Sequence, residues 1–289
     1  MKRPRVCLGL VAALLVSSGL ACAQPPLWLV RGRHTIIYLF GSVHLLPPGL
    51  DWAPPRLLEA LPKAKEIWFE LPIDETTDVA AAKLSLSQGY LPAGDSLSKH
   101  LTPDQDARLR RVCGLLGLPR DAVEALRPWL AEVTLSLKDD ERAGASAAHG
   151  VEQQLQALAP ASAKRHALET PRQQIAFLAG AALSDQIASL DETLHEIEDQ
   201  PRAYQRVLDG WMTGDLEELD ADALEPLRRA SPALYRRLIT DRNAHWAKRV
   251  KRRLAGSGVV VVVVGAGHLL GPEGLPARLR AAGVTVEGP

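Results

Sequence analysis

The chain has 289 residues, of which 46% are hydrophobic and 24% are charged, and these proportions are ordinary for a globular protein. Lysine plus arginine equals aspartate plus glutamate at 34 each, so no overall charge favours nucleic acid or an anionic membrane as a partner. The expected partner is a peptide, a small molecule or a metal ion, and the sequence sets no oligomeric state.

Residues 1–23 have the pattern of a secretory signal peptide. A basic start and an apolar run from Val6 to Leu20 precede Ala21-Cys22-Ala23, which supplies the small-x-small pattern of a cleavage site. The apolar run is shorter than the ~20 residues that a membrane-spanning helix needs. We therefore expect cleavage after Ala23, export to a periplasm or to the outside of the cell, and a mature chain of residues 24–289 without a membrane span.

A lipoprotein anchored at Cys22 is the alternative. It is disfavoured because Gly19 lies three places before the cysteine, where a bulky aliphatic residue is usual. Cleavage after Ala23 leaves Cys113 as the only cysteine, so the mature chain can form neither an internal disulfide nor a cysteine-rich zinc site. Cleavage also removes three basic residues and no acidic ones, which leaves 31 basic and 34 acidic residues and a net charge of −3.

Strand patterns lie near the two ends of the mature chain. Leu27–Val30 and Thr35–Phe40 predict a hairpin, and Glu66–Leu71 predicts another strand after a short helix at Pro55–Leu61. Near the C-terminus, Val259–Val264 is a run of six valines. Such a run predicts a central parallel strand that is buried on both faces.

Helix patterns fill the middle, from about residue 95 to residue 256. Thr102 and Thr170 each begin a capping box with a glutamine three residues later, and Ser231 begins a helix that is predicted to reach Gly256. One strand, Arg165–Glu169, interrupts these helices. A short helix and a last strand end the chain, at Pro276–Ala282 and Val284–Glu287.

The order of these elements predicts one α/β domain over residues 24–289. Its mixed sheet is built from the N- and C-terminal segments, with a large helical insertion between them. The sequence contains no internal repeat and no long linker that would divide it.

Two of the predicted strands end in the same motif. Gly41-Ser-Val-His44 follows the strand Ile36–Phe40, and Gly265-Ala-Gly-His268 follows the valine strand. In a parallel sheet, ligands gather outside the carboxyl ends of the strands. We therefore expect both imidazoles at one edge of the sheet, with a glycine allowing the tight bend after each strand.

Glu70 reaches the same edge at the end of its own strand. A carboxylate that follows three apolar residues is poorly hydrated unless a positive group compensates it. Two imidazoles and a carboxylate at one point are a common donor set for a divalent metal. The alternative is an ordinary ion pair between Glu70 and Lys63 or Lys65.

Two further charged residues are candidates for this site. Glu169 lies just before the helix that begins at Thr170, where it could be catalytic or could only stabilise the helix N-terminus. Arg242 lies in the apolar stripe of its helix, and a buried arginine needs an acidic partner such as Glu70 or Glu169. The alternative for Arg242 is a side chain that extends to the surface.

The glycines that follow the valine strand do not make a dinucleotide-binding site. Gly265, Gly267 and Gly271 have the wrong spacing for G-x-G-x-x-G, and only 18 residues follow Gly271, too few to complete such a unit. The sequence also lacks H-E-x-x-H, G-x-S-x-G and a P-loop.

Together these motifs resemble the TraB/PrgY/GumN family, which includes the Tiki-like metalloproteases. One departure is Val151-Glu152, where the family favours Ile-Asp. The resemblance runs through nearly the whole mature chain and rests on Trp28-Leu-Val, Tyr38-Leu-Phe-Gly-Ser-Val-His44, Phe69-Glu-Leu71, His149-Gly-Val-Glu-Gln, Leu168-Glu-Thr170 with Gln173 or Gln174, Arg242-Asn243, and Val264-Gly-Ala-Gly-His-Leu-Leu-Gly-Pro-Glu-Gly-Leu275.

The resemblance implies an α/β fold related to erythromycin esterase-like and haem-binding ChaN-like proteins. It also implies metal-dependent hydrolysis at two histidines and a glutamate. Carried over by position, these are His44, His268 and Glu70.

The leading hypothesis is therefore an exported, divalent-metal-dependent hydrolase that acts on peptide bonds. His44 and His268 would hold Mn²⁺, Co²⁺ or Zn²⁺, all of which suit nitrogen and oxygen ligands. Glu70 would be a third ligand or the base that takes a proton from the bound water. Arg242 would hold a carboxylate or stabilise the oxyanion, and Glu169 would be a second acid.

The rival hypothesis is a non-enzymatic protein that binds a metal, haem or a small ligand in the same pocket. A cleft that is open to an extended chain beside these residues favours hydrolysis. A flat apolar slot favours the binding of haem or another ligand.

Overall fold

The computed structural model describes residues 24–289, so the predicted signal peptide lies outside the described residues. A six-stranded mixed sheet has the strand order β4-β3-β5-β2-β1-β6. β2, β3, β4 and β5 run parallel, and β1 is antiparallel to both β2 and β6. The strands are β1 (Leu27–Arg31), β2 (Thr35–Ser42), β3 (Ala64–Phe69), β4 (Lys164–Ala167), β5 (Gly258–Gly265) and β6 (Thr285–Glu287).

The valine strand lies in the centre of this sheet, between β2 and β3, as predicted. Successive side chains of a strand point to opposite faces. On one face, Val261 and Val263 pack against α1 (Pro55–Ala60), α6 (Val151–Leu158) and α9 (Ala203–Thr213). On the other face, Val260, Val262 and Val264 pack against α13 (Asp241–Arg253) and α14 (Leu275–Ala281). Both faces are covered, which explains why β5 is apolar throughout.

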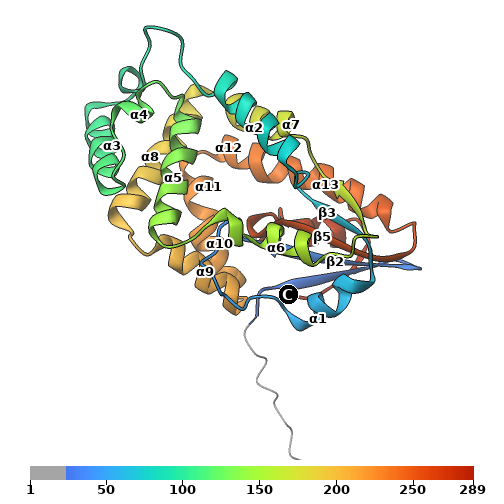
Figure 1. Ribbon diagram of the computed structural model, residues 1–289. Helices are drawn as coiled ribbons and strands as arrows, with labels where there is room; N and C mark the ends of the chain where they lie inside the picture. Colours follow the sequence, from blue (N-terminus) through green and yellow to red (C-terminus); the bar gives the residue numbers. More distant parts are fainter. Residues whose placement is uncertain (1–23) are drawn as a thin grey trace, which may run out of the picture.

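Helices make up most of the remaining chain, and a helical part that contains α3, α5 and α8 lies beside the sheet (Figure 1). Its apolar core is separate from the two clusters on the sheet. The helices are α1 (Pro55–Ala60), α2 (Glu75–Gln88), α3 (Pro103–Leu115), α4 (Asp121–Glu124), α5 (Pro128–Arg142), α6 (Val151–Leu158), α7 (Pro171–Ala179), α8 (Leu183–Asp199), α9 (Ala203–Thr213), α10 (Leu216–Ala223), α11 (Glu225–Ala230), α12 (Pro232–Tyr235), α13 (Asp241–Arg253) and α14 (Leu275–Ala281).

Local patterns located most of these elements. The capping boxes at Thr102 and Thr170 are both present. The long helix predicted after Ser231 is instead α12 and α13 joined by one π-helical segment, η4 (Arg236–Thr240). Helix α2 was not predicted: its apolar residues do not gather on one face, and Thr77 is its only buried residue. Within residues 24–289, no helix has both the length and the apolar character needed to cross a bilayer.

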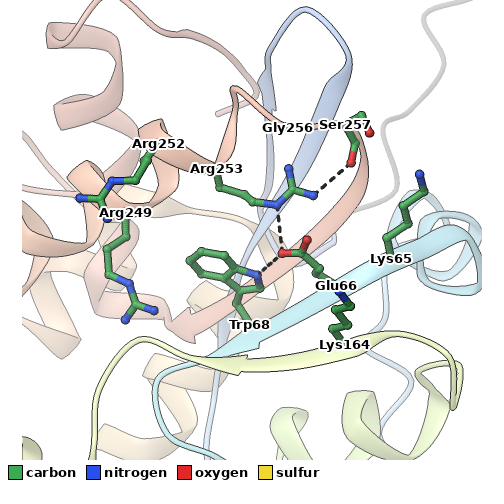
Figure 2. Close-up of a pocket in the computed structure, with 9 residues that line it drawn as sticks. All are labelled: Lys65, Glu66, Trp68, Lys164, Arg249, Arg252, Arg253, Gly256 and Ser257. Carbon is green, nitrogen blue, oxygen red and sulfur yellow. Dashed lines mark hydrogen bonds and ion pairs between the residues drawn. The ribbon is translucent and has the colours of Figure 1, made fainter.

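The two ends of the parallel strands carry different kinds of side chains. The carboxyl ends carry the predicted site residues His44, Glu70, Glu169 and His268. The amino ends of β3, β4 and β5 carry a pocket lined mainly by basic side chains, which come from β3, from β4 and from the C-terminal half of α13 (Figure 2).

Candidate functional site

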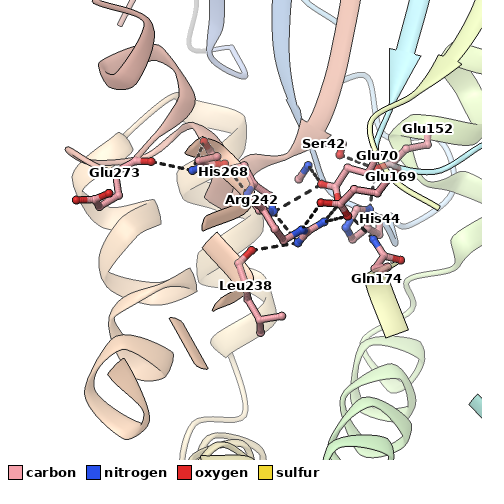
Figure 3. A network of polar contacts seen from close by, with 12 residues as sticks. Ser42, His44, Glu70, Glu152, Glu169, Gln174, Leu238, Arg242, His268 and Glu273 are labelled. Carbon is pink, nitrogen blue, oxygen red and sulfur yellow. Dashed lines mark hydrogen bonds and ion pairs between the residues drawn. The ribbon is translucent and has the colours of Figure 1, made fainter. Parts of the chain in front are cut away.

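The structure brings together all five residues of the predicted site at the carboxyl edge of the sheet. His44 follows β2, Glu70 follows β3, Glu169 follows β4, and His268 lies in the 3-10 turn η5 (Ala266–Leu269) after β5. Arg242 reaches the same point from the first turn of α13 (Figure 3). Residues up to 224 positions apart are neighbours here because parallel strands end at a common edge.

Arg242 lies at the centre of this group, and its side chain is only 8% exposed. Its Nε and NH2 atoms donate to the two carboxylate oxygens of Glu169 at 2.9 and 3.0 Å, and NH2 also donates to Glu70 Oε2 at 2.6 Å. Its NH1 atom donates to the carbonyl oxygen of Leu238 at 3.1 Å and to His268 Nε2 at 3.0 Å. These contacts account for all five N–H groups of a guanidinium.

Arg242 was predicted either to hold a carboxylate in place or to stabilise an oxyanion. A guanidinium with every N–H group engaged holds carboxylates in place, and it has no free donor for an oxyanion. The contacts of Arg242 contradict two alternatives from the sequence. Glu70 pairs with Arg242 and not with Lys63 or Lys65, and the Arg242 side chain is buried between Glu70 and Glu169 and does not extend to the surface.

The pKa values of the two carboxyl groups in the cluster are shifted in opposite directions. Burial alone would raise the pKa of Glu70, but His268, Arg242, His44 and the backbone N–H of Gly265 outweigh burial and hold this pKa at about 2. Glu70 is therefore an anion at any physiological pH. Burial raises the pKa of Glu169 above its ordinary value, and Arg242 offsets this effect only in part.

His268 is fixed by hydrogen bonds to both of its ring nitrogens. Asn243 donates through Nδ2 to the carbonyl oxygens of His268 and Glu273, which turns its Oδ1 toward His268 Nδ1 at 2.8 Å. In this arrangement Nδ1 carries the proton and Nε2 accepts from Arg242. Burial and the neighbouring Arg242 lower the pKa of His268 to about 3, so the ring is neutral.

His44 is held differently, by a carboxylate from α6. Its Nδ1 atom lies 2.7 Å from Glu152 Oε1, which also accepts a hydrogen bond from Ser42 Oγ at 2.5 Å. Glu152 raises the pKa of His44 to about 9. The His44 side chain is 62% exposed, and among residues 24–289 its Nε2 atom has no hydrogen-bond partner.

Gly265 leaves a small space between these groups. A Cβ atom on this residue would lie 3.3 Å from Glu70 Oε1, 3.5 Å from His44 Nε2 and 3.8 Å from His268 Cδ2. The same glycine donates its backbone N–H to Glu70 Oε1 at 2.7 Å. The absence of a side chain therefore keeps open a space next to one free imidazole nitrogen and one carboxylate oxygen.

The predicted metal donors do not form a three-ligand site in this arrangement. The lone pair of His268 Nε2 accepts from Arg242, and both oxygens of Glu70 already accept from N–H groups. Within residues 24–289, no group of three or more His, Cys, Asp or Glu side chains is placed to hold a metal ion. An ion between His268 and Glu70 would have to displace the guanidinium of Arg242, so a bound Mn²⁺, Co²⁺ or Zn²⁺ stays a prediction.

A cleft of about 680 Å³ opens beside the site, between the carboxyl edge of the sheet and the helical part. His44, Glu70 and Arg242 lie on one wall. Much of the opposite wall is apolar and includes Phe177, Leu178, Val207, Leu224 and Leu227. Convergent polar groups beside an apolar wall are typical of clefts that bind small molecules and peptides.

Sequence reasoning missed three residues of the site. Ser42 and Asn243 lie within motifs that were quoted for the family resemblance, but no role was assigned to them. Glu152 was treated as a departure from the family pattern, although it places a carboxylate where the family has aspartate. An acidic residue at this position both in the family and in this chain was the available signal. The hydrogen bond to His44 shows what the carboxylate contacts.

Comparison with known proteins agrees with these motifs. The model of the TraB/PrgY/gumN family matches residues 26–288. Proteins named "Uncharacterized protein YbaP" from Shigella flexneri and from Escherichia coli strain K12 are each 29% identical over 257 residues, which cover 87% of this chain and 90% of the relative. No solved structure gives a significant match. Because the family match covers nearly the whole described chain, the protein belongs to the TraB/PrgY/gumN family.

Proposed function

We propose that this protein is a hydrolase that cleaves a peptide bond or a related acyl bond in the cleft beside His44, after export directed by residues 1–23. One observation carries the proposal. His44 presents a free ring nitrogen to the cleft, while its other nitrogen is held by the carboxylate of Glu152. A histidine whose other nitrogen is held by a carboxylate is a recurring arrangement in general-base catalysis.

In the proposed reaction, water occupies the space beside Gly265, between His44 Nε2 and Glu70 Oε1. The water oxygen attacks the carbonyl carbon of the substrate as its proton passes to His44 Nε2. The C–N bond then breaks, and the same proton is returned to the leaving nitrogen. Glu152 stabilises the imidazolium that forms between these two transfers, and the anionic Glu70 orients the water.

Arg242, Glu169 and His268 are positioning residues in this scheme. Arg242 joins the two carboxylates and His268, and Asn243 fixes the ring of His268. The cluster thereby holds Glu70 at a defined place beside His44. Its rigidity supports catalysis because a displacement of about 1 Å at a reacting group can cost roughly 10²-fold in rate.

Two finer points belong to this proposal. The cleft beside the polar groups supports hydrolysis over the rival reading of a haem- or ligand-binding protein, which predicts a flat apolar slot. A relationship to erythromycin esterase-like and ChaN-like folds is proposed on the resemblance together with the mixed sheet.

The test compares the full chain with its Gly265→Ala variant on a peptide library. The φ angle of Gly265 is −49°, which alanine also adopts, so we expect the variant to fold. The added methyl group fills the space for water, and we expect at least roughly 10²-fold lower activity. Cleavage that is equally fast in both proteins would contradict the proposed site. Cleavage by neither protein, with tight binding of haem or a metal instead, would favour the rival reading.

A chelator added to the same assay tests the metal. The engaged lone pairs of His268 and Glu70 lead us to expect activity that survives the chelator and a protein that retains no stoichiometric metal. Activity that is lost with chelator and restored by Mn²⁺, Co²⁺ or Zn²⁺ would show that a metal ion displaces the guanidinium of Arg242 from His268 and Glu70.

Glu152→Gln is expected to change how activity depends on pH. Only neutral His44 can accept a proton, and its pKa of about 9 means that the neutral fraction, and with it kcat/KM, rises with pH up to about 9. Glutamine keeps a hydrogen bond but removes the negative charge, so the rising limb should move toward the ordinary histidine pKa of about 6.5. A pH profile of kcat/KM measures this shift. If the rising limb stays at the same pH in the variant, the group that must lose a proton is not His44.

A further inference from the structure

The basic pocket lies at the amino ends of β3, β4 and β5, at the opposite edge of the sheet from the site (Figure 2). It measures about 670 Å³ and is lined by Lys65, Glu66, Trp68, Lys164, Arg249, Arg252, Arg253, Gly256 and Ser257. Five of these side chains are cationic, and Glu66 is the only acidic one. The predicted net charge of the mature chain is −3, so the pocket concentrates charge of the opposite sign.

Arg253 forms a fixed part of the pocket, with a side chain that is 14% exposed. Its Nε atom donates to Glu66 Oε2 at 2.9 Å, and NH2 donates to the carbonyl oxygen of Ser257 at 3.0 Å. A Cβ atom on Gly256 would lie only 2.4 Å from NH1, so the guanidinium packs directly against this glycine. NH1 is buried and has no hydrogen-bond partner among residues 24–289.

Arg249 is also held in place, but its charge is not neutralised. It donates to the carbonyl oxygens of Ala167 and Leu168 and lies over the ring of Trp68 at 5.4 Å. These partners are polar or aromatic and carry no negative charge. Burial and the positive charge of Arg252 lower the pKa of Arg249, which agrees with an excess of positive charge in the pocket.

Lys65, Lys164 and Arg252 form the exposed rim of the pocket. Among residues 24–289 none of these three side chains has a carboxylate partner. The one carboxylate of the pocket, Glu66, pairs with Arg253, and its Oε2 atom lies 3.6 Å from His166 Nε2. The C-terminus of α13 favours arginines in its last turn. That preference does not explain the two lysines, which come from strands.

We propose that this pocket binds a phosphate group, carried by a small phosphorylated molecule or by an anionic lipid headgroup. Preformed guanidinium groups suit tetrahedral oxyanions because their N–H donors are fixed in a planar fork. Five cations facing one carboxylate favour a polyvalent anion over a single carboxylate. The site is separate from the proposed hydrolytic centre and does not depend on it.

The test is calorimetric titration of the full chain with inorganic pyrophosphate, and sedimentation with phosphatidylglycerol vesicles. The Lys164→Ala/Arg252→Ala variant removes two exposed cations and should fold normally. We expect its affinity for the probe to fall at least about tenfold, because charge-assisted contacts are lost. The matched control is Arg56→Ala/Lys83→Ala, which removes the same charge from exposed positions on α1 and α2 and should bind as the unchanged protein does.

The two probes distinguish the two sources of the phosphate group. Saturable pyrophosphate binding that weakens only in the pocket variant supports a small phosphorylated ligand. Binding to the vesicles alone, with the same dependence on Lys164 and Arg252, supports a lipid headgroup. Equal loss of binding in the pocket variant and in the control, or no binding of either probe, would overturn the proposal.

Discussion

His44→Ala is expected to lower kcat/KM for peptide hydrolysis by roughly 10³-fold, within the range that a general base contributes. The reason is that His44 carries the ring nitrogen that faces the space beside Gly265, where the attacking water is proposed to bind. Glu70 lies nearby, but a carboxylate with a pKa of about 2 is too weak a base at neutral pH. Steady-state kinetics on the best library peptide measures the loss.

His44→Ala also removes the ion pair with Glu152, so thermal unfolding of the variant is measured beside its kinetics to separate lost stability from lost catalysis. His245→Ala is the matched control, because this histidine is exposed on α13 and lies outside the cleft. The control should keep full activity. If His44→Ala kept full activity as well, the proposed reaction would be wrong, whatever the effect of the other site residues.

Arg242→Met is expected to lower the free energy of unfolding by about 3–5 kcal/mol, the usual cost of removing one partner from a buried ion pair. The substitution leaves Glu70 and Glu169 buried without a counter-charge. Urea denaturation of both proteins measures the difference. Arg236→Met removes an exposed arginine just before the same helix, and it should change stability by less than about 0.5 kcal/mol.

The cost of Arg242→Met should also depend on pH. Without the guanidinium, the pKa of both buried carboxyls should be higher in the folded variant than in the folded unchanged protein, so the folded variant binds more protons. The stability that the substitution removes must then grow as the pH rises. We expect a smaller loss at pH 5 than at pH 8, and partial recovery when Glu70→Gln and Glu169→Gln are added. A loss that is equal at both pH values, without recovery, would show that packing rather than charge sets the effect.

Local sequence patterns predicted much of the fold because they report on a few neighbouring residues. The valine run indicated a strand buried on both faces, and the two Thr-Pro segments indicated helix starts that the structure contains. Helix α2 was missed because its exposed surface gives it no apolar periodicity. The π-helical segment before Asp241 has no comparable local signature, since it depends on how the helix packs.

The two Gly-x-x-His motifs were visible in the sequence, as was the edge of the sheet at which they meet. The sequence also named Glu70 and Glu169 as possible partners of Arg242. Only the tertiary structure showed that Arg242 binds both, because this depends on where two strand ends and the first turn of α13 place their side chains.

The different roles of the two histidines were likewise decided by packing. His268 and His44 stand in the same sequence motif, but α13 brings Arg242 and Asn243 to His268, whereas α6 brings Glu152 to His44 across 108 positions. One ring is thereby buried, neutral and fully bonded, and the other keeps a free nitrogen. The sequence by itself indicated that His44, His268 and Glu70 lie at one edge of the sheet. The packing of two helices on the sheet decided which histidine keeps a free nitrogen, because a hydrogen-bond partner from a distant segment leaves no local pattern.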